Sequence, residues 1–139
     1  MNTFESNLKL SVIIKIQPDK SRATYLREDA KKRETHMNKS LAVIELDDTN
    51  ANYYLELTYD IFMSRLRAKM LEDGFTTSGE GAHEAQISYL EVLKFSQKDI
   101  QFMDQLRYFR NGIKYYGKSF SAEYAKKAIE YVKRNKERV

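Results

Sequence analysis

The sequence has no cysteine and no tryptophan, and only one proline and five glycines among its 139 residues. Without cysteine, neither disulfides nor thiolate metal sites can form, as we expect of a protein from the reducing cytoplasm. Scarce glycine and proline, together with 32% charged residues, favour long helices with solvated faces. A chain of this length has room for one domain with one hydrophobic core.

Long hydrophobic runs are also missing. No apolar run approaches the roughly 20 residues that a membrane-spanning helix requires. The longest aliphatic stretch, residues 8–16, is interrupted by Lys9, Ser11 and Lys15. It lacks the small-residue cleavage pattern of a signal peptide. We therefore expect no membrane partner and a cytoplasmic location.

The motifs of common enzymes are absent too. The sequence has no glycine-rich phosphate loop, no H-E-x-x-H and no G-x-S-x-G. Two histidines, His36 and His83, are too few for a histidine-based metal site, so we expect neither a metal nor a cofactor. His83 next to Glu84 at a helix start has the pKa range of a general base. We favour the simpler interpretation, a polar residue near a helix start, and keep the pair as a secondary site candidate.

Hydrophobic periodicity predicts an all-α fold of about five helices. Stripes spaced three and four residues apart predict helices over residues 20–44, 51–72 and 82–93, and the second, apolar over a wide arc, is expected to be the central one. Residues 47–50 offer capping oxygens for that second helix, a capping box of Ser96 and Asp99 opens a fourth helix, and Ser121 caps a fifth. Gly74 is expected to end the second helix, and residues 76–81 to form a loop. Short connections between these helices predict an up-and-down bundle.

The first 17 residues form a separate N-terminal arm in this interpretation, and residues 18–139 form the helical domain. Apolar and other residues alternate over residues 8–16, which favours a short extended segment, although a helical turn also fits.

Positive charge is concentrated near the end of the chain. Residues 107–139 hold ten Lys or Arg against three Glu, whereas residues 1–106 hold fourteen against seventeen acids. Between Arg107 and Lys118 there are four basic residues and no carboxylate. Such a basic segment is compatible with an anionic partner, and equally with a solvated helix face.

Arg110 occupies a position on the fourth helix where the apolar stripe predicts a hydrophobic residue. A guanidinium at such a seam must meet a carboxylate, backbone carbonyls, a subunit boundary or a ligand, because burying it unpaired is costly. Tyr108, Tyr115 and Tyr116 interleave with the basic residues. Arginine with tyrosine is typical of surfaces that stack on bases and grip phosphate. The alternative is a structural ion pair with tyrosines that belong to the core.

At these residues the chain resembles the HEPN superfamily of helical domains, most closely a small archaeal-type group. The resemblance covers nearly the whole chain from Ile16 onward. It is carried by QPDKSRATYLREDAKKR, LELTYDIFMSRLRAKMLEDGF, HEAQISYL and LRYFRNGIKYYGKSFSAEYAKKAIEYV. The strongest part is Arg110-Asn111 followed by Tyr115-Tyr116-Gly117.

In the ribonuclease members of that superfamily, an arginine and a polar residue precede a histidine by a short gap. The resemblance places the arginine on Arg110 and the polar residue on Asn111, and the histidine position falls on Tyr115, Tyr116 or Gly117. A tyrosine hydroxyl, with a pKa of about 10, is a poor general base at neutral pH. The resemblance therefore implies the fold and the location of the site, and argues against metal-independent RNA cleavage.

We accordingly expect a non-catalytic or vestigial HEPN module that binds a nucleotide, RNA or a protein partner. The expected contact residues are Arg107, Arg110, Asn111, Lys114, Tyr115, Tyr116 and Lys118. The family implies a homodimer, often paired with a minimal nucleotidyltransferase as in toxin–antitoxin systems. Two alternatives are a metal-independent ribonuclease using Arg110 with a tyrosine, and a purely structural homodimeric subunit.

Overall fold

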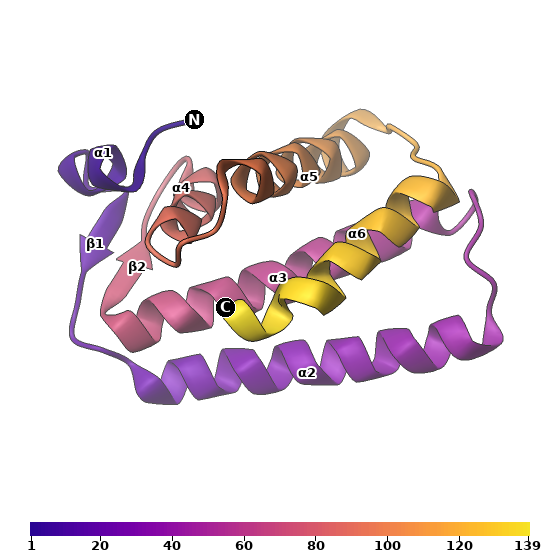
Figure 1. Cartoon of the computed structure of the whole chain (residues 1–139), viewed down its shortest axis with the longest axis horizontal. Helices are drawn as coiled ribbons and strands as arrows, with labels where there is room; N and C mark the ends of the chain where they lie inside the picture. The colour runs from indigo at the N-terminus through magenta and orange to yellow at the C-terminus, as the bar shows by residue number, and fades with distance from the viewer.

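Helices account for most of the chain and confirm the predicted all-α bundle. The computed structural model describes all residues from Met1 to Val139. Its elements, in chain order, are α1 Phe4–Lys9, β1 Ile13–Lys15, α2 Lys20–Val43, α3 Ala51–Asp73, β2 Phe75–Thr77, α4 Ala82–Ser88, a 3₁₀ turn Tyr89–Glu91, α5 Gln97–Tyr116, α6 Ala122–Asn135 and a second 3₁₀ turn Lys136–Arg138 (Figure 1). No helix combines the length and the apolar character needed to cross a membrane.

The central element is α3, which packs against α2, α5 and α6. Leu55, Phe62 and Leu66 of this helix are fully buried. Its wide apolar arc is that of the innermost helix of a bundle. The predicted stop at Gly74 is confirmed, since Gly74 has a φ of 88° and a Cβ there would lie 2.9 Å from the carbonyl oxygen of Ile16.

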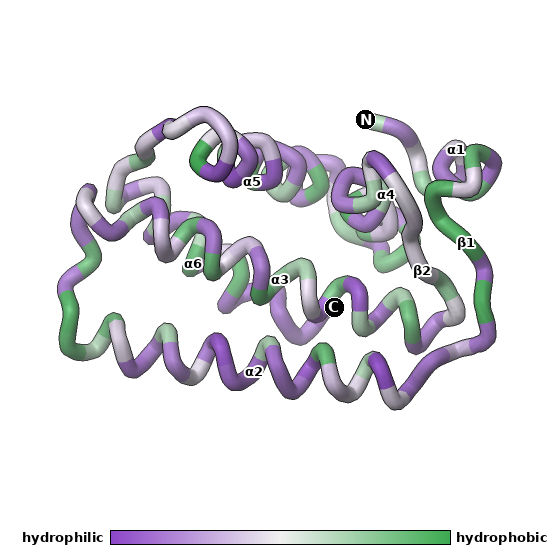
Figure 2. The backbone as a smooth tube through the Cα atoms, turned by 180° about the vertical axis from the view of Figure 1, so that it is seen from behind, coloured by the Kyte–Doolittle hydropathy of each residue, from purple (hydrophilic) through white to green (hydrophobic).

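The long helix α2 lies along α3 and is mostly hydrophilic, with short hydrophobic bands (Figure 2). The apolar stripe is interrupted where Arg33 stands in the sequence. Arg33 turns to solvent and pairs with Asp29 at 2.9 Å, whereas Glu34 is buried and accepts a 2.7 Å hydrogen bond from Nζ of Lys136. This buried acid ties α2 to the C-terminal turn. Ile44, predicted to close the helix, is exposed just beyond its end.

The N-terminal arm differs from the predicted extended segment. Residues Phe4–Lys9 form α1, because the hydroxyl of Thr3 accepts the amide hydrogen of Ser6 and caps the helix. Only residues Ile13–Lys15 are extended, antiparallel to β2 with Ile13 opposite Thr77. The pairing needs a partner strand, which Phe75–Thr77 provides, so the first two residues of the predicted loop, 76 and 77, are in a strand. Ile13 is buried in the main core.

Local capping chemistry sets the remaining helix starts. Ser96 accepts from the amide of Asp99 and Ser121 accepts from the amide of Tyr124, which confirms both predicted caps. Residues 47–50, in contrast, do not cap α3 as predicted. Asp48 instead accepts the amide hydrogen of Ala122 at 2.8 Å and so caps α6. The predicted helix over residues 82–93 is shorter, because α4 ends at Ser88 and continues as a 3₁₀ turn.

Candidate functional site

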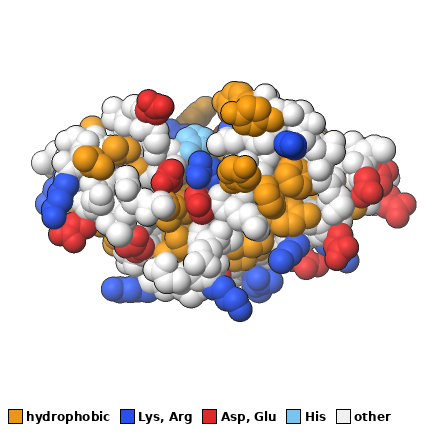
Figure 3. Space-filling model, turned by 90° about the horizontal axis from the view of Figure 1, so that it is seen from above, with side chains coloured by type: hydrophobic (Ala, Val, Ile, Leu, Met, Phe, Trp, Pro, Cys, Tyr) orange, Lys and Arg blue, Asp and Glu red, His pale blue; other side chains and the backbone are white.

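The predicted contact segment lies on α5 and in the turn after it, and the fold divides it into two environments. Arg107 and Arg110 face neighbouring helices and are partly buried, whereas Lys114 and Lys118 are exposed. Helix α4 packs on α5, and carboxylates of α3, α4 and α5 itself come close to the two arginines. Figure 3 shows this face, with charged side chains of both signs beside a histidine near the middle and hydrophobic side chains gathered to the right.

Arg110 finds a carboxylate at its seam position. Its side chain is 12% exposed, and Nη2 lies 3.4 Å from Oδ1 of Asp60 on α3, whose own side chain is 39% exposed. The guanidinium carbon also lies 5.5 Å from the centre of the Tyr59 ring, a cation–π geometry. Nε of Arg110 is buried and has no hydrogen-bond partner. The sequence left several kinds of partner open for Arg110, and the structure shows a carboxylate, that of Asp60.

Two carboxylates lie close to the guanidinium of Arg107. Its Nε donates to Oδ1 of Asp104 at 2.9 Å, one turn earlier on α5, and its Nη2 lies 3.7 Å from Oε2 of Glu84 on α4. Residues 107–118 include no acid, yet the fold brings three carboxylates close to their arginines, those of Glu84, Asp104 and Asp60. Two of the four positive charges in this segment are balanced locally, which reduces their attraction for an external phosphate.

His83 joins the same group from α4. Nδ1 of His83 lies 3.1 Å from the hydroxyl of Tyr59, and the two rings are stacked with centroids 6.1 Å apart. Burial lowers the pKa of His83, and the positive charges of Arg110 and Arg67 lower it further. Burial also raises the pKa of Tyr59 well above its usual value. Both rings are therefore neutral at physiological pH.

We call these residues the polar cluster: Tyr59, Asp60, His83, Glu84, Asp104, Arg107 and Arg110. The sequence predicted both arginines and set His83 and Glu84 apart as a secondary pair, and the fold brings the two groups together. It did not predict Tyr59, Asp60 or Asp104. The spacing of Asp104 and Arg107, three residues apart on one helix, was the one local signal available.

The lowered pKa of His83 predicts a loss of stability on the acid side. As the pH falls below about 6.5, the unfolded chain binds the proton before the folded chain does, so the free energy of unfolding decreases until the folded pKa is reached. Above that window the residue contributes no pH dependence. We expect His83→Asn to lose less stability than the parent between about pH 7.5 and pH 5, measured by urea unfolding. Equal losses in the two proteins would contradict this.

Replacing Arg110 should destabilise the fold mainly through its apolar stem. The ion pair with Asp60 is partly exposed and contributes little, whereas the stem packs beside Tyr59. We expect Arg110→Ala to cost about 1–2 kcal/mol and Arg110→Met to recover most of it. Thermal unfolding of both variants measures this. If Arg110→Met is as unstable as Arg110→Ala, the charge rather than the stem carries the effect.

The second environment is a hollow at the C-terminal end of α5. Its volume is about 400 Å³, and we call it the tyrosine hollow; it is lined by Tyr108, Phe109, Asn111, Gly112, Tyr115, Tyr116, Lys118 and Phe120. The three tyrosines are between 66% and 77% exposed, so they are not core residues. The rings of Phe109 and Phe120 pack together with centroids 4.7 Å apart.

The turn that closes the hollow is held from α3. Nδ2 of Asn52 donates to the carbonyl oxygen of Lys118 at 2.8 Å, and Oδ1 of Asn52 accepts from the amide of Phe120 at 2.9 Å. Gly117 ends α5 in the left-handed conformation, with a φ of 63°. The backbone of the hollow is therefore fixed by a side chain nearly 70 residues away in sequence.

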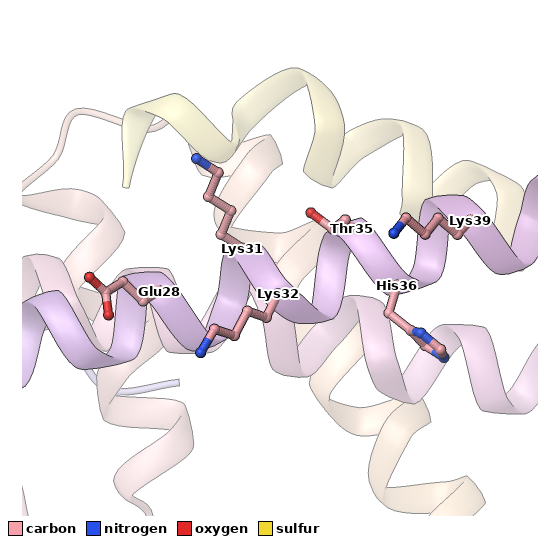
Figure 4. Close-up of a pocket in the computed structure, with 6 residues that line it drawn as sticks. All are labelled: Glu28, Lys31, Lys32, Thr35, His36 and Lys39. Atoms are coloured by element: carbon pink, nitrogen blue, oxygen red, sulfur yellow. The ribbon is translucent and has the colours of Figure 1, made fainter.

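A second hollow, on α2, does not form a convergent site. Its lining residues, Glu28, Lys31, Lys32, Thr35, His36 and Lys39, all come from one helix, and none is hydrophobic. The side chains spread to different sides of the helix and do not point toward a common centre (Figure 4). No group of three or more carboxylate or histidine side chains is gathered closely enough to hold a metal ion.

Comparison with known proteins returns no relative on which the site can be mapped. No family model, no curated protein and no solved structure matches this chain. The polar cluster and the tyrosine hollow are therefore the features of this chain that bear on its function.

Proposed function

We propose that this chain is a HEPN-like module that binds a nucleotide or RNA, and that its contact surface is the tyrosine hollow together with Lys114 and Lys118. One observation carries the proposal: three exposed tyrosines surround a hollow beside two exposed lysines that form no ion pair. Stacking of a base on an aromatic side chain contributes about 1–3 kcal/mol, and unpaired lysines attract phosphate.

Titration of a labelled single-stranded RNA at several salt concentrations tests the proposal. We expect binding that weakens with salt, because each phosphate contact on a single strand contributes roughly 0.7 to the log–log slope. Absence of binding at high micromolar protein and low salt would refute it and would favour a protein partner.

A second candidate, RNA cleavage, is favoured by the position of His83. His83 of α4 lies within hydrogen-bonding distance of the Tyr59 hydroxyl, and Arg110 contacts the same Tyr59 ring, so a neutral imidazole belongs to the cluster that contains Arg110. A neutral imidazole is a suitable general base, and such catalysis is typically worth about a hundredfold to ten-thousandfold. Incubating the protein with labelled RNA in EDTA separates this from binding alone. Cleavage lost in His83→Ala, with binding retained, would establish the enzyme.

We further expect a homodimer formed along α5. The resemblance to HEPN domains motivates this expectation, because in HEPN dimers two copies of the motif face one cleft, and a two-fold contact would bring two copies of the basic surface together. Static light scattering should report about twice the 16.4 kDa of the chain. A mass of 16.4 kDa at high micromolar protein would exclude the dimer.

A further inference from the structure

The tyrosine hollow has the size and lining of a site for one flat aromatic group. Its volume of about 400 Å³ lies in the range of about 300–1,000 Å³ that is usual for small-molecule sites. Phe109 and Phe120 are half-buried and contribute apolar surface, while the three tyrosines that line the hollow are exposed. Aromatic walls over an apolar base suit a planar ring more than a chain or a sphere.

Gly112 is an unusual residue for its place. It lies inside α5, where glycine stabilises a helix less than any residue except proline. A Cβ at this position would lie 3.2 Å from Cγ of Lys118, which packs across the glycine. Gly112 itself lines the hollow. The glycine therefore keeps the hollow open and lets Lys118 lie along its edge.

The polar groups at the rim complement a base that carries a phosphate. The side-chain amide of Asn111 lines the hollow and makes no hydrogen bond within the chain, so its donor and acceptor are free for a base edge. Lys118 lines the hollow, and no carboxylate does. The C-terminal end of a helix carries partial negative charge, so the backbone here repels phosphate. The positive charge for a phosphate comes from the exposed side chains of Lys118 and Lys114.

We infer that the tyrosine hollow takes one unpaired nucleobase, so that the ligand class is a single-stranded nucleic acid or a free nucleotide and not a duplex. The inference rests on the proposed function and adds the form of the ligand. A base inside a duplex is stacked and paired, and its faces cannot reach a hollow in a protein surface. An unpaired base presents a face for Tyr115 or Tyr108 and an edge for Asn111.

Fluorescence anisotropy with the full chain tests this. The probes are a labelled single-stranded RNA, the same strand in a duplex, and adenosine monophosphate or ribose 5-phosphate as competitors. We expect the single strand to bind at least about tenfold more tightly than the duplex, and the nucleotide but not the sugar phosphate to compete. A competing mononucleotide that matches the single strand in affinity would identify the free nucleotide as the ligand.

Two variants probe the hollow itself. Gly112→Leu should fill the hollow and weaken single-strand binding about tenfold. Its Cβ would lie 3.2 Å from Cγ of Lys118, so that side chain must shift, and circular dichroism checks that the helix content is unchanged. Tyr115→Ala should weaken binding by a similar factor. Tyr25→Ala, which removes an equally exposed tyrosine from α2, is the matched control and should bind normally. Equal affinity for both RNA forms, unchanged by either variant, would overturn the nucleobase site while leaving RNA binding intact. Absence of any binding would overturn both.

Discussion

Replacing both Lys114 and Lys118 with alanine is expected to weaken the binding of single-stranded RNA about tenfold, or ~1.4 kcal/mol. These are the two positive charges of the segment that no carboxylate compensates, whereas Arg107 and Arg110 are paired with Asp104, Glu84 and Asp60. The log–log salt slope should flatten by roughly 1.4, or about 0.7 for each lost contact. Titrations at three or more salt concentrations measure both quantities.

The matched control removes the same charge from another surface. Lys31 and Lys32 are exposed on α2 and make no ion pair, so Lys31→Ala with Lys32→Ala lowers the net charge equally. We expect this double variant to bind nearly as the parent does. If it loses as much affinity as the α5 variant, binding follows the overall charge of the protein and has no defined site.

The largest expected effect on stability comes from Phe62→Ala. Phe62 is fully buried on α3 and lies between the helices that pack on it, with its ring 6.3 Å from that of Tyr131 on α6. Truncation removes apolar burial and leaves a cavity, which together cost about 3–5 kcal/mol. Since natural domains are stable by only about 5–15 kcal/mol, the variant should melt some 10–20 °C lower.

Tyr53→Ala provides the comparison for that measurement. Tyr53 is exposed on the same helix, and its removal should change the free energy of unfolding by no more than about 0.5 kcal/mol. Thermal and urea unfolding followed by circular dichroism measure both variants. A small loss in Phe62→Ala would show that α3 is not the centre of the core.

Much of the helical framework was predictable, because it depends on groups close together in the chain. Ser96 and Ser121 cap the helices they precede, and Gly74 ends α3 at the position where a left-handed residue is required. These are interactions over three or four residues. The wide apolar arc of α3 similarly predicted a central helix, because side-chain periodicity reports directly which faces are buried.

Contacts between distant segments were not predictable in the same way. Asp48 was expected to cap the helix after it, and its carboxylate instead reaches α6, 74 residues further along. Alternation over residues 8–16 favours an extended segment, but a strand forms only at Ile13–Lys15, where Phe75–Thr77 lies beside it. In both cases the deciding partner is remote in sequence.

The fold class, most helix boundaries and the basic, tyrosine-rich segment on one helix could be inferred from the order of the residues alone. Which charges of that segment are uncompensated depends on how the helices pack. Asp60 stands 50 residues before Arg110, and Glu84 comes to Arg107 from another helix. The sequence of one helix shows only the charges on that helix, whereas the local electric potential depends on every charged group packed within a few ångströms. Packing therefore explains why the charges of Arg107 and Arg110 are compensated while Lys114 and Lys118 stay exposed. It also explains why His83 belongs to the same cluster as the two arginines.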